Sequence, residues 1–448
     1  MPTPPRPRLA LAAFGRATFD LDQAAAMLTR SRAALQALPI DLVLASDLLT
    51  DPGAAAVFAR SAPNADLVIC QFTTFVDARF VAAVAAATPA PLLLWSLREP
   101  GAPGERLALN SLTGANLAAR ELQGRGRFFR FVLGDPEDAA VGARVTALGR
   151  VAAVRRWLDG FRVLVLGGAP DGFFFSAPDA ARLASTGATL QHLDLDTLFA
   201  AAMALPQEAW APIATLAATQ VSGLDRLPPQ QVEKFARLQA VVEAEVAARG
   251  ASAVAVRCWP EFFTDFGAAA CSFVSALNER GVAASCEADV LGALTMAVLQ
   301  RLTGGAPYLG DLAAVDPERN AAVFWHCGAG AYSLASPRTG AVAGVQPNRQ
   351  IGFTLEFALK PGRVTIARLG ETPAGLRLLV GGGLALDAPQ RFLGTAATVR
   401  LDGARPVQEQ VGALIEAGWE PHYALAYGDV RQELTDLAAM LGIPAVAM

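Results

Sequence analysis

The sequence predicts an α/β protein in which two consecutive doubly wound parallel-sheet domains precede a mainly antiparallel, β-barrel-like C-terminal domain. Strand-like apolar runs alternate with helical stretches as far as about Gly304, which is typical of parallel sheets. Beyond Gly304, short segments of alternating apolar and polar residues indicate antiparallel sheet. The length of 448 residues also favours several domains. We expect them at 1–160, 161–303 and 304–448.

The first domain is predicted from buried strands and the helices between them. Its strands are expected at Arg8–Phe14, Ile40–Ala45, Asp66–Cys70 and Pro91–Ser96, and its helices include Asp22–Leu35, Asp77–Ala86 and Asp138–Leu158. The apolar part of the first strand is too short for a signal peptide.

The second domain is predicted to repeat this pattern, and the third to depart from it. Strands of the second domain are expected near 161–166 and at Thr189–Leu193, Ser252–Cys258 and Val282–Cys286, with helices at Pro228–Arg249, Thr264–Arg280 and Leu291–Leu302. Antiparallel strands of the third are expected at Gln350–Leu359, Arg363–Leu369, Leu376–Gly381 and Ala396–Leu401. Adjacent open α/β layers place a crevice at the carboxyl ends of their strands.

Composition narrows the classes of function. Hydrophobic residues make up 53% of the chain and charged residues 17%, and no apolar run reaches the roughly 18 residues that span a bilayer. The net charge of −4 argues against nucleic acid as a partner. The five cysteines are scattered and form no C-x-x-C pair, which favours reduced thiols and a cytoplasmic protein.

Two carboxylates and one imidazole stand near predicted strand ends. Glu261 follows Ser252–Cys258, Asp289 follows the next strand, and His422 begins a strand near the end of the chain. The carboxyl ends of neighbouring parallel strands share one edge of a sheet, so Glu261 and Asp289 are expected there together. Taken singly, Asp289 is equally well explained as a helix cap and Glu261 as an acid facing a helix dipole. Together with His422 they are the ligands of a hard divalent metal.

Other residues near these ligands carry weaker signals. Glu287 lies two residues before Asp289, and we interpret it as supporting or structural. His326 follows an apolar strand but cannot easily share one ion with the adjacent Cys327, so substrate contact suits it better. His192 has no polar cluster beside it and is expected to be structural. The residues assigned to substrate contact are Trp259, Trp325 and His326.

The glycine clusters give no support for a nucleotide cofactor. The segment 167–172 lacks both the G-x-G-x-x-G spacing and the Lys-Ser/Thr of a phosphate loop. Gly381–Gly383 lies in the antiparallel part and is expected to form a turn or a bulge.

The predicted ligand set suggests a particular chemistry. Mn²⁺ or Mg²⁺ held by two carboxylates and an imidazole keeps positions open for oxygen ligands. A sugar carbonyl and its neighbouring hydroxyl would fill two of them, and the ion would stabilise the charge that develops when the α-carbon loses a proton. One carboxylate would act as base at C2 while the other moved the hydroxyl proton. This is aldose–ketose isomerisation through an enediolate.

Motifs around these residues resemble the L-fucose isomerase family, in particular its short branch. Glu261 in Trp-Pro-Glu-Phe-Phe, Asp289 in Glu-Ala-Asp and His422 before Ala-Tyr-Gly look like the three metal-ligand motifs of that family. Trp325-His-Cys-Gly is similar to a segment of its short members. The resemblance covers most of the chain in order and is strongest from Arg257 to Ser336 and from Gly418 to the end.

The resemblance implies that Glu261, Asp289 and His422 bind Mn²⁺, with Mg²⁺ or Co²⁺ as alternatives. It implies that Glu261 and Asp289 also form the acid/base pair. A homo-oligomer, trimer or hexamer, with active sites near subunit boundaries is implied as well. The expected substrate is a hexose-type aldose, deoxy or substituted at C6, such as fucose or sulfoquinovose.

Two other functions fit the same residues. One is a non-catalytic sugar-binding protein of the same fold, although such a protein would be free to lose the three ligands. The other is a metal-dependent epimerase or dehydratase, which would share the first proton abstraction. Detection of a ketose product after incubation with a panel of aldoses separates these alternatives.

Overall fold

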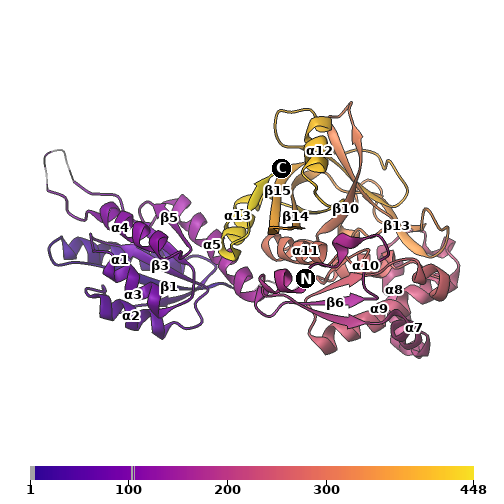
Figure 1. Ribbon diagram of the computed structural model, residues 1–448, viewed down its shortest axis with the longest axis horizontal. Helices are drawn as coiled ribbons and strands as arrows, with labels where there is room; N and C mark the ends of the chain where they lie inside the picture. Colours follow the sequence, from indigo (N-terminus) through magenta and orange to yellow (C-terminus); the bar gives the residue numbers. More distant parts are fainter. Residues whose placement is uncertain (1–5, 102–103, 105) are drawn as a thin grey trace. The chain divides into compact units, whose positions relative to one another are not determined.

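The computed structural model describes residues 6–101, 104 and 106–448. Its contacts divide the chain into two compact units, Pro5–Trp157 and Leu158–Met448, which run from indigo to purple and from magenta to yellow in Figure 1. The stretch judged too short for a signal peptide forms the first strand, and residues 1–5 lie outside the described part. The division into three domains stays a prediction.

The first unit is built on a five-stranded parallel sheet with the order β2-β1-β3-β4-β5. The order reverses beside β1, which is the arrangement of a doubly wound sheet. Apolar residues of β1, β3 and β4 form one core with helices α2, α3 and α4. Its strands are β1 (Arg8–Phe14), β2 (Asp41–Leu44), β3 (Leu67–Phe72), β4 (Leu92–Ser96) and β5 (Phe129–Leu133). Its helices are α1 (Leu21–Gln36), α2 (Pro52–Ser61), α3 (Arg79–Ala87), α4 (Ser111–Gly124) and α5 (Ala139–Leu158).

The second unit opens with a four-stranded parallel sheet of order β7-β6-β8-β9. Its strands are β6 (Arg162–Leu166), β7 (Thr189–Leu193), β8 (Ala253–Val256) and β9 (Ala283–Ser285). Its helices are α6 (Ala180–Ala184), α7 (Leu195–Ala204), α8 (Gln207–Gln220), α9 (Pro229–Arg249), α10 (Cys271–Glu279) and α11 (Val290–Thr303). The loops after β8 and β9 lead to the candidate site.

The rest of the second unit is a six-stranded antiparallel barrel with added strands. β16 pairs with both β11 and β15, which closes the ring β16-β11-β10-β17-β14-β15. Closure removes the exposed edges of these strands. The barrel strands are β10 (Tyr308–Asp316), β11 (Ala321–His326), β14 (Gly362–Thr372), β15 (Gly375–Ala385), β16 (Thr395–Leu401) and β17 (His422–Tyr427). The added elements are β12 (Val342–Val345), β13 (Phe353–Ala358), β18 (Ala445–Ala447), α12 (Val407–Glu416) and α13 (Arg431–Leu441).

One hydrophobic core joins the parallel sheet to the barrel. It includes Val254 of β8, Phe273 of α10, Phe324 of β11 and Ile366 of β14, all buried. Helix α11 packs against β14 and β17, so it connects the end of β9 to the barrel wall. This packing carries the loop after β9 to the end of the barrel where β17 begins. Among the described helices, none has the length and apolarity needed to cross a membrane.

The predicted fold class is confirmed, with two local corrections. Gly381–Gly383 is neither a turn nor a bulge, because it lies inside β15 and pairs with β14 throughout. Glycine is needed there for close approach, since a Cβ on Gly383 would lie 2.5 Å from the carbonyl oxygen of Arg400. The predicted helix Thr264–Arg280 is interrupted by Gly267 at φ 71°, and α10 begins only at Cys271.

The core that joins sheet and barrel should be sensitive to the loss of a single ring. Phe324 is fully buried, with its ring 5.7 Å from that of Tyr423. We expect Phe324→Ala to lower the free energy of unfolding of the second unit by about 3–5 kcal/mol. Urea titration followed by tryptophan fluorescence measures this loss. Phe174→Ala, at a side chain 88% exposed, is the control and should change it by about 0.5 kcal/mol or less. An equal loss in both variants would contradict the expectation.

Candidate metal centre

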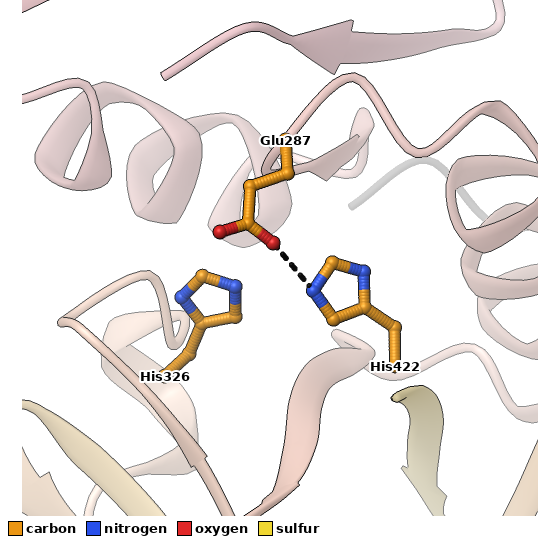
Figure 2. Close-up of side chains that lie close together, drawn as sticks. All are labelled: Glu287, His326 and His422. Atoms are coloured by element: carbon orange, nitrogen blue, oxygen red, sulfur yellow. Dashed lines mark ion pairs between the residues drawn. The ribbon is translucent and has the colours of Figure 1, made fainter. Parts of the chain in front are cut away.

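Three side chains that could ligate a metal ion come together in the second unit. Glu287 lies between β9 and α11, His326 ends β11, and His422 begins β17. One ligand atom from each lies within 4.8 Å of the others. Figure 2 shows the carboxylate of Glu287 pointing toward the two imidazole rings. Both rings are buried, whereas Glu287 keeps part of its side chain exposed.

The register of the barrel places the two histidines at the same end. β10 lies between β11 and β17, and it is antiparallel to both. Asp311 of β10 pairs with Trp325 of β11 on one side and with His422 of β17 on the other. The end of β11, the middle of β10 and the start of β17 therefore lie side by side, and Asp311 lies on the strand between the two histidines.

The backbone after β9 turns so that its two acids point to different places. Glu287 and Ala288 are both left-handed, at φ 55° and 53°. This conformation is uncommon for residues other than glycine and is often found at functional sites. Asp289 returns to extended backbone and caps α11, with its Oδ1 accepting from the backbone N–H of Gly292 at 2.8 Å. The two carboxylates therefore do not share one face.

Instead, these two carboxylates hold opposite nitrogens of His422. Oε2 of Glu287 lies 2.9 Å from Nε2 of His422, and Oδ2 of Asp289 lies 2.9 Å from Nδ1. Oδ1 of Asp311 lies 3.4 Å from the same Nε2. The imidazole is therefore fixed from the Asp289 side and faces Glu287 and Asp311 with its other nitrogen.

Asp289 has no contact with solvent. Its side chain is 0% exposed and is ion-paired to Arg368, which is 0% exposed as well. Burial opposes ionisation of Asp289, but Arg368 and His422 outweigh it and hold the pKa of this carboxyl well below its usual range. Asp289 is therefore an anion that accepts the Nδ1–H of His422. This pattern, a carboxylate behind a histidine, is common around metal-bound histidines.

The two imidazoles lie in a strongly anionic environment. Burial disfavours their charged forms, but the neighbouring acids outweigh it. The close contacts with Asp289 and Glu287 help to raise the pKa of His422 to about 9. The pKa of His326 is raised to about 10, with Cys327 as the largest contribution against burial. Such surroundings favour positive charge at the centre of the cluster.

One nitrogen of each imidazole lacks the hydrogen bond that a structural histidine would have, whereas each Nδ1 has a partner. Nε2 of His326 and Nε2 of His422 are buried and have no hydrogen-bond partner among the described residues. The 2.9 Å contact between His422 and Glu287 lacks hydrogen-bond geometry. Buried polar atoms in proteins are nearly always paired, so unpaired ones call for an explanation. Two imidazoles and a carboxylate are donors that a divalent metal accepts, and they fit such an ion.

Comparison with known proteins identifies the family. No protein family model matches the chain. A sulfoquinovose isomerase of Alkalicoccus urumqiensis is 43% identical over 403 residues, which cover 89% of this chain and 90% of the relative. Those of Priestia aryabhattai and Clostridium sp. (strain MSTE9) are 42% and 38% identical, and each match covers 96% of this chain and 96% or more of the relative.

The chain belongs to the sulfoquinovose isomerase family. The predicted enzyme class, an isomerase, is thereby confirmed, and so is the wider prediction of a sugar isomerase family. A specific relationship to the L-fucose isomerase family stays a prediction.

In this sulfoquinovose isomerase family member, Asp289 and His422 of the predicted ligand set are in contact. The carboxylate of Glu261 is instead held by Arg257, whose Nε lies 3.0 and 2.9 Å from its two oxygens. The contact with Arg257 lowers the pKa of Glu261, and this effect is larger than the opposing effect of burial. The roles assigned to Glu261 and Asp289 stay predictions.

Two of the residues assigned to substrate contact adjoin the cluster. Nε1 of Trp259 lies 3.3 Å from Oε1 of Glu287 and donates to it. The ring of Trp325 stacks on His326 at 6.3 Å, and its Nε1 donates to the carbonyl oxygen of Leu393. His326, assigned to the same group, is itself a member of the cluster. Their contact with sugar stays a prediction.

The sequence reasoning missed two residues of this site in the isomerase. Asp311 interrupts the apolar strand β10, and Arg368 interrupts the apolar strand β14. A charged residue inside an otherwise apolar run of sequence is unusual and was the available signal. Glu287 was noticed but interpreted as supporting, because two left-handed residues in succession cannot be read from Glu287-Ala288.

Proposed function

We propose that the protein is a metal-dependent aldose–ketose isomerase that acts on sulfoquinovose. Glu287, His326 and His422 would hold the ion, which we take to be Mn²⁺, with Mg²⁺ or Co²⁺ as alternatives. The observation that carries this proposal is the pair of buried Nε2 atoms that lack a hydrogen bond among the described residues and lie beside a carboxylate. The names of the relatives, sulfoquinovose isomerases along almost the whole chain, supply the reaction and the sugar.

The proposed reaction needs a metal ion, a group that transfers protons and a residue that orients the metal ligand His422. A divalent ion bound at the cluster would act as a Lewis acid on the sugar's carbonyl and adjacent hydroxyl oxygens. Proton transfer between C2 and C1 needs a carboxylate that the substrate can reach. The side chains of Glu261 and Asp311 are 28% and 32% exposed, whereas Asp289 is 0% exposed. We assign proton transfer to Glu261 and Asp311, and the orientation of His422 to Asp289.

Two broader expectations belong to the same proposal. All five cysteines are free thiols, which supports a protein of the reducing cytoplasm. Assembly into a homo-oligomer rests on the family resemblance alone.

A labelled substrate tests the reaction and its route together. Sulfoquinovose carrying deuterium at C2 is incubated with enzyme and Mn²⁺, and the product is followed by NMR. We expect the corresponding ketose, with loss of deuterium to water, because a carboxylate that removes the proton exchanges it with solvent. Glucose, which lacks the sulfonate, serves as the comparison and should react more slowly.

Each contrary result has its own meaning. Ketose with complete retention of the label would replace proton transfer by a hydride shift. Absence of ketose from sulfoquinovose at any metal concentration would overturn the proposed function.

A further inference from the structure

Arg368 is a buried cation that lies just behind the candidate metal centre. It stands in β14, its side chain is 0% exposed, and its Nη1 is ion-paired to Oδ2 of Asp289. Its Nε lies 3.6 Å from Oε2 of Glu420. That contact is too long for a hydrogen bond, and neither Nε nor Nη2 of Arg368 has a hydrogen-bond partner among the described residues.

A contribution to the stability of the fold does not explain well why an arginine is buried at this position. Removing a guanidinium from water is costly, and a buried ion pair is often no better for stability than apolar side chains of the same volume. Here the cost is increased because two nitrogens of Arg368 have no hydrogen bond. A buried arginine in this setting calls for another explanation.

The contacts of Arg368 lead to His422 by two routes. The first is polar: Oδ2 of Asp289 accepts from Arg368 and also lies 2.9 Å from Nδ1 of His422. The second is a cation–π contact: the guanidinium of Arg368 lies 5.7 Å from the ring centre of Phe175. That ring meets the imidazole of His422 edge-on, with centroids 5.4 Å apart and planes at 88°. One guanidinium therefore contacts both groups that fix the ring.

We infer that Arg368 is a positioning residue that holds Asp289 and Phe175 in place. Through these two residues it fixes the ring of His422 with Nδ1 as donor and Nε2 turned toward the proposed metal site. The inference rests on the proposed function for the identity of the ligand at Nε2. The inferred orientation of the His422 ring does not depend on the proposed function. Among the described residues, Arg368 makes its polar contacts with Asp289 and Glu420 and not with the three cluster residues, so its effect is indirect.

Three variants test this role. Arg368→Met removes the charge and keeps much of the volume. Arg368→Lys keeps the charge but loses the planar group that reaches Asp289 and lies over Phe175. Arg363→Met is the matched control, because Arg363 lies on the same strand but is 36% exposed and ion-paired to Asp402. Circular dichroism and thermal unfolding establish which variants are folded.

The first measurement is Mn²⁺ affinity, from the EPR signal of free Mn²⁺ during titration of the metal-free protein. We expect about a 10-fold to 100-fold loss of affinity in Arg368→Met, the range for groups that orient metal ligands. Arg368→Lys should lose less, and Arg363→Met should match the parent. Adding Asp289→Asn to Arg368→Met should cause little further loss, because both act through the same contact. Parent-like affinity in folded Arg368→Met or Arg368→Lys would overturn the inference.

The second measurement needs neither metal nor activity. The protein has three histidines, so the ring N–H signals of ¹⁵N-histidine-labelled, metal-free protein can be assigned by substitution of each in turn. We expect a slowly exchanging signal from Nδ1–H of His422 in the parent and in Arg363→Met, and its loss in Arg368→Met or Arg368→Lys. An unchanged signal in a folded Arg368 variant would overturn the inference. If the parent shows this signal but neither binds Mn²⁺ nor isomerises sugar, the proposed function fails while the role of Arg368 stands.

Discussion

Glu287→Gln should reduce kcat/KM for sulfoquinovose by about 10³-fold or more. Glutamine keeps the size of the side chain but removes the only carboxylate of the three-residue cluster. A metal ion contributes several kcal/mol to the stabilisation of transition-state charge, and about 1.4 kcal/mol corresponds to each tenfold change in rate. The loss should appear in both kcat and Mn²⁺ affinity, because the carboxylate acts through the ion.

Two comparisons make this result specific. Glu318→Gln changes an exposed glutamate in the same unit and should behave like the parent. Glu261→Gln should lower kcat and leave Mn²⁺ affinity nearly unchanged, because we assign Glu261 to proton transfer and not to the ion. The opposite pattern, with affinity lost in Glu261→Gln and kept in Glu287→Gln, would favour the ligand set predicted from the sequence.

Asp289→Asn should damage both the site and the stability of the second unit. Asparagine is as good an N-cap as aspartate, so α11 should keep its start. The lost charge removes the closer of the two anionic partners of the buried Arg368 and leaves only the 3.6 Å contact with Glu420, which costs about 3–5 kcal/mol. It also removes the anion that accepts from Nδ1 of His422. We expect the free energy of unfolding to fall by that amount and Mn²⁺ affinity to fall about 100-fold.

A control at another cap separates these effects from capping itself. Asp51 caps α2 of the first unit through its side chain, accepting from the backbone N–H of Ala54. Asp51→Asn should leave Mn²⁺ affinity and kcat unchanged. Urea titration and EPR-detected Mn²⁺ binding measure the two parts for each variant. If Asp289→Asn keeps the parent's free energy of unfolding and Mn²⁺ affinity, the contacts of Asp289 with Arg368 and His422 contribute to neither.

Most helices and strands could be predicted from the sequence, because buried elements show recognisable runs or periodic positions of apolar residues. The strand predicted at Arg8–Phe14 is β1 with the same bounds, and Thr189–Leu193 is β7. Arg8–Phe14 is a mainly apolar run, which a buried parallel strand requires. Thr189–Leu193 contains Gln191 and His192 and forms an edge strand of its sheet. The antiparallel barrel followed from alternation, although β10 and β12 were not named as strands.

The candidate site was less accessible, because it depends on backbone angles and on register. Asp289 was weighed both as a ligand and as a cap, and the structure shows it capping α11. Glu287 was set aside because nothing in its neighbours indicates a left-handed backbone. His326 comes near His422 only through the pairing of β10 with both β11 and β17. No local pattern in a single sequence contains that pairing.

Anomalous diffraction from crystals grown with Mn²⁺ tests the central claim most directly. We expect one strong peak in the anomalous difference map, within bonding distance of Glu287, His326 and His422, with Asp289 hydrogen-bonded behind His422. A peak bound by Glu261 and Asp289 with Glu287 turned away, or no peak near His422 in crystals of active enzyme, would contradict the account.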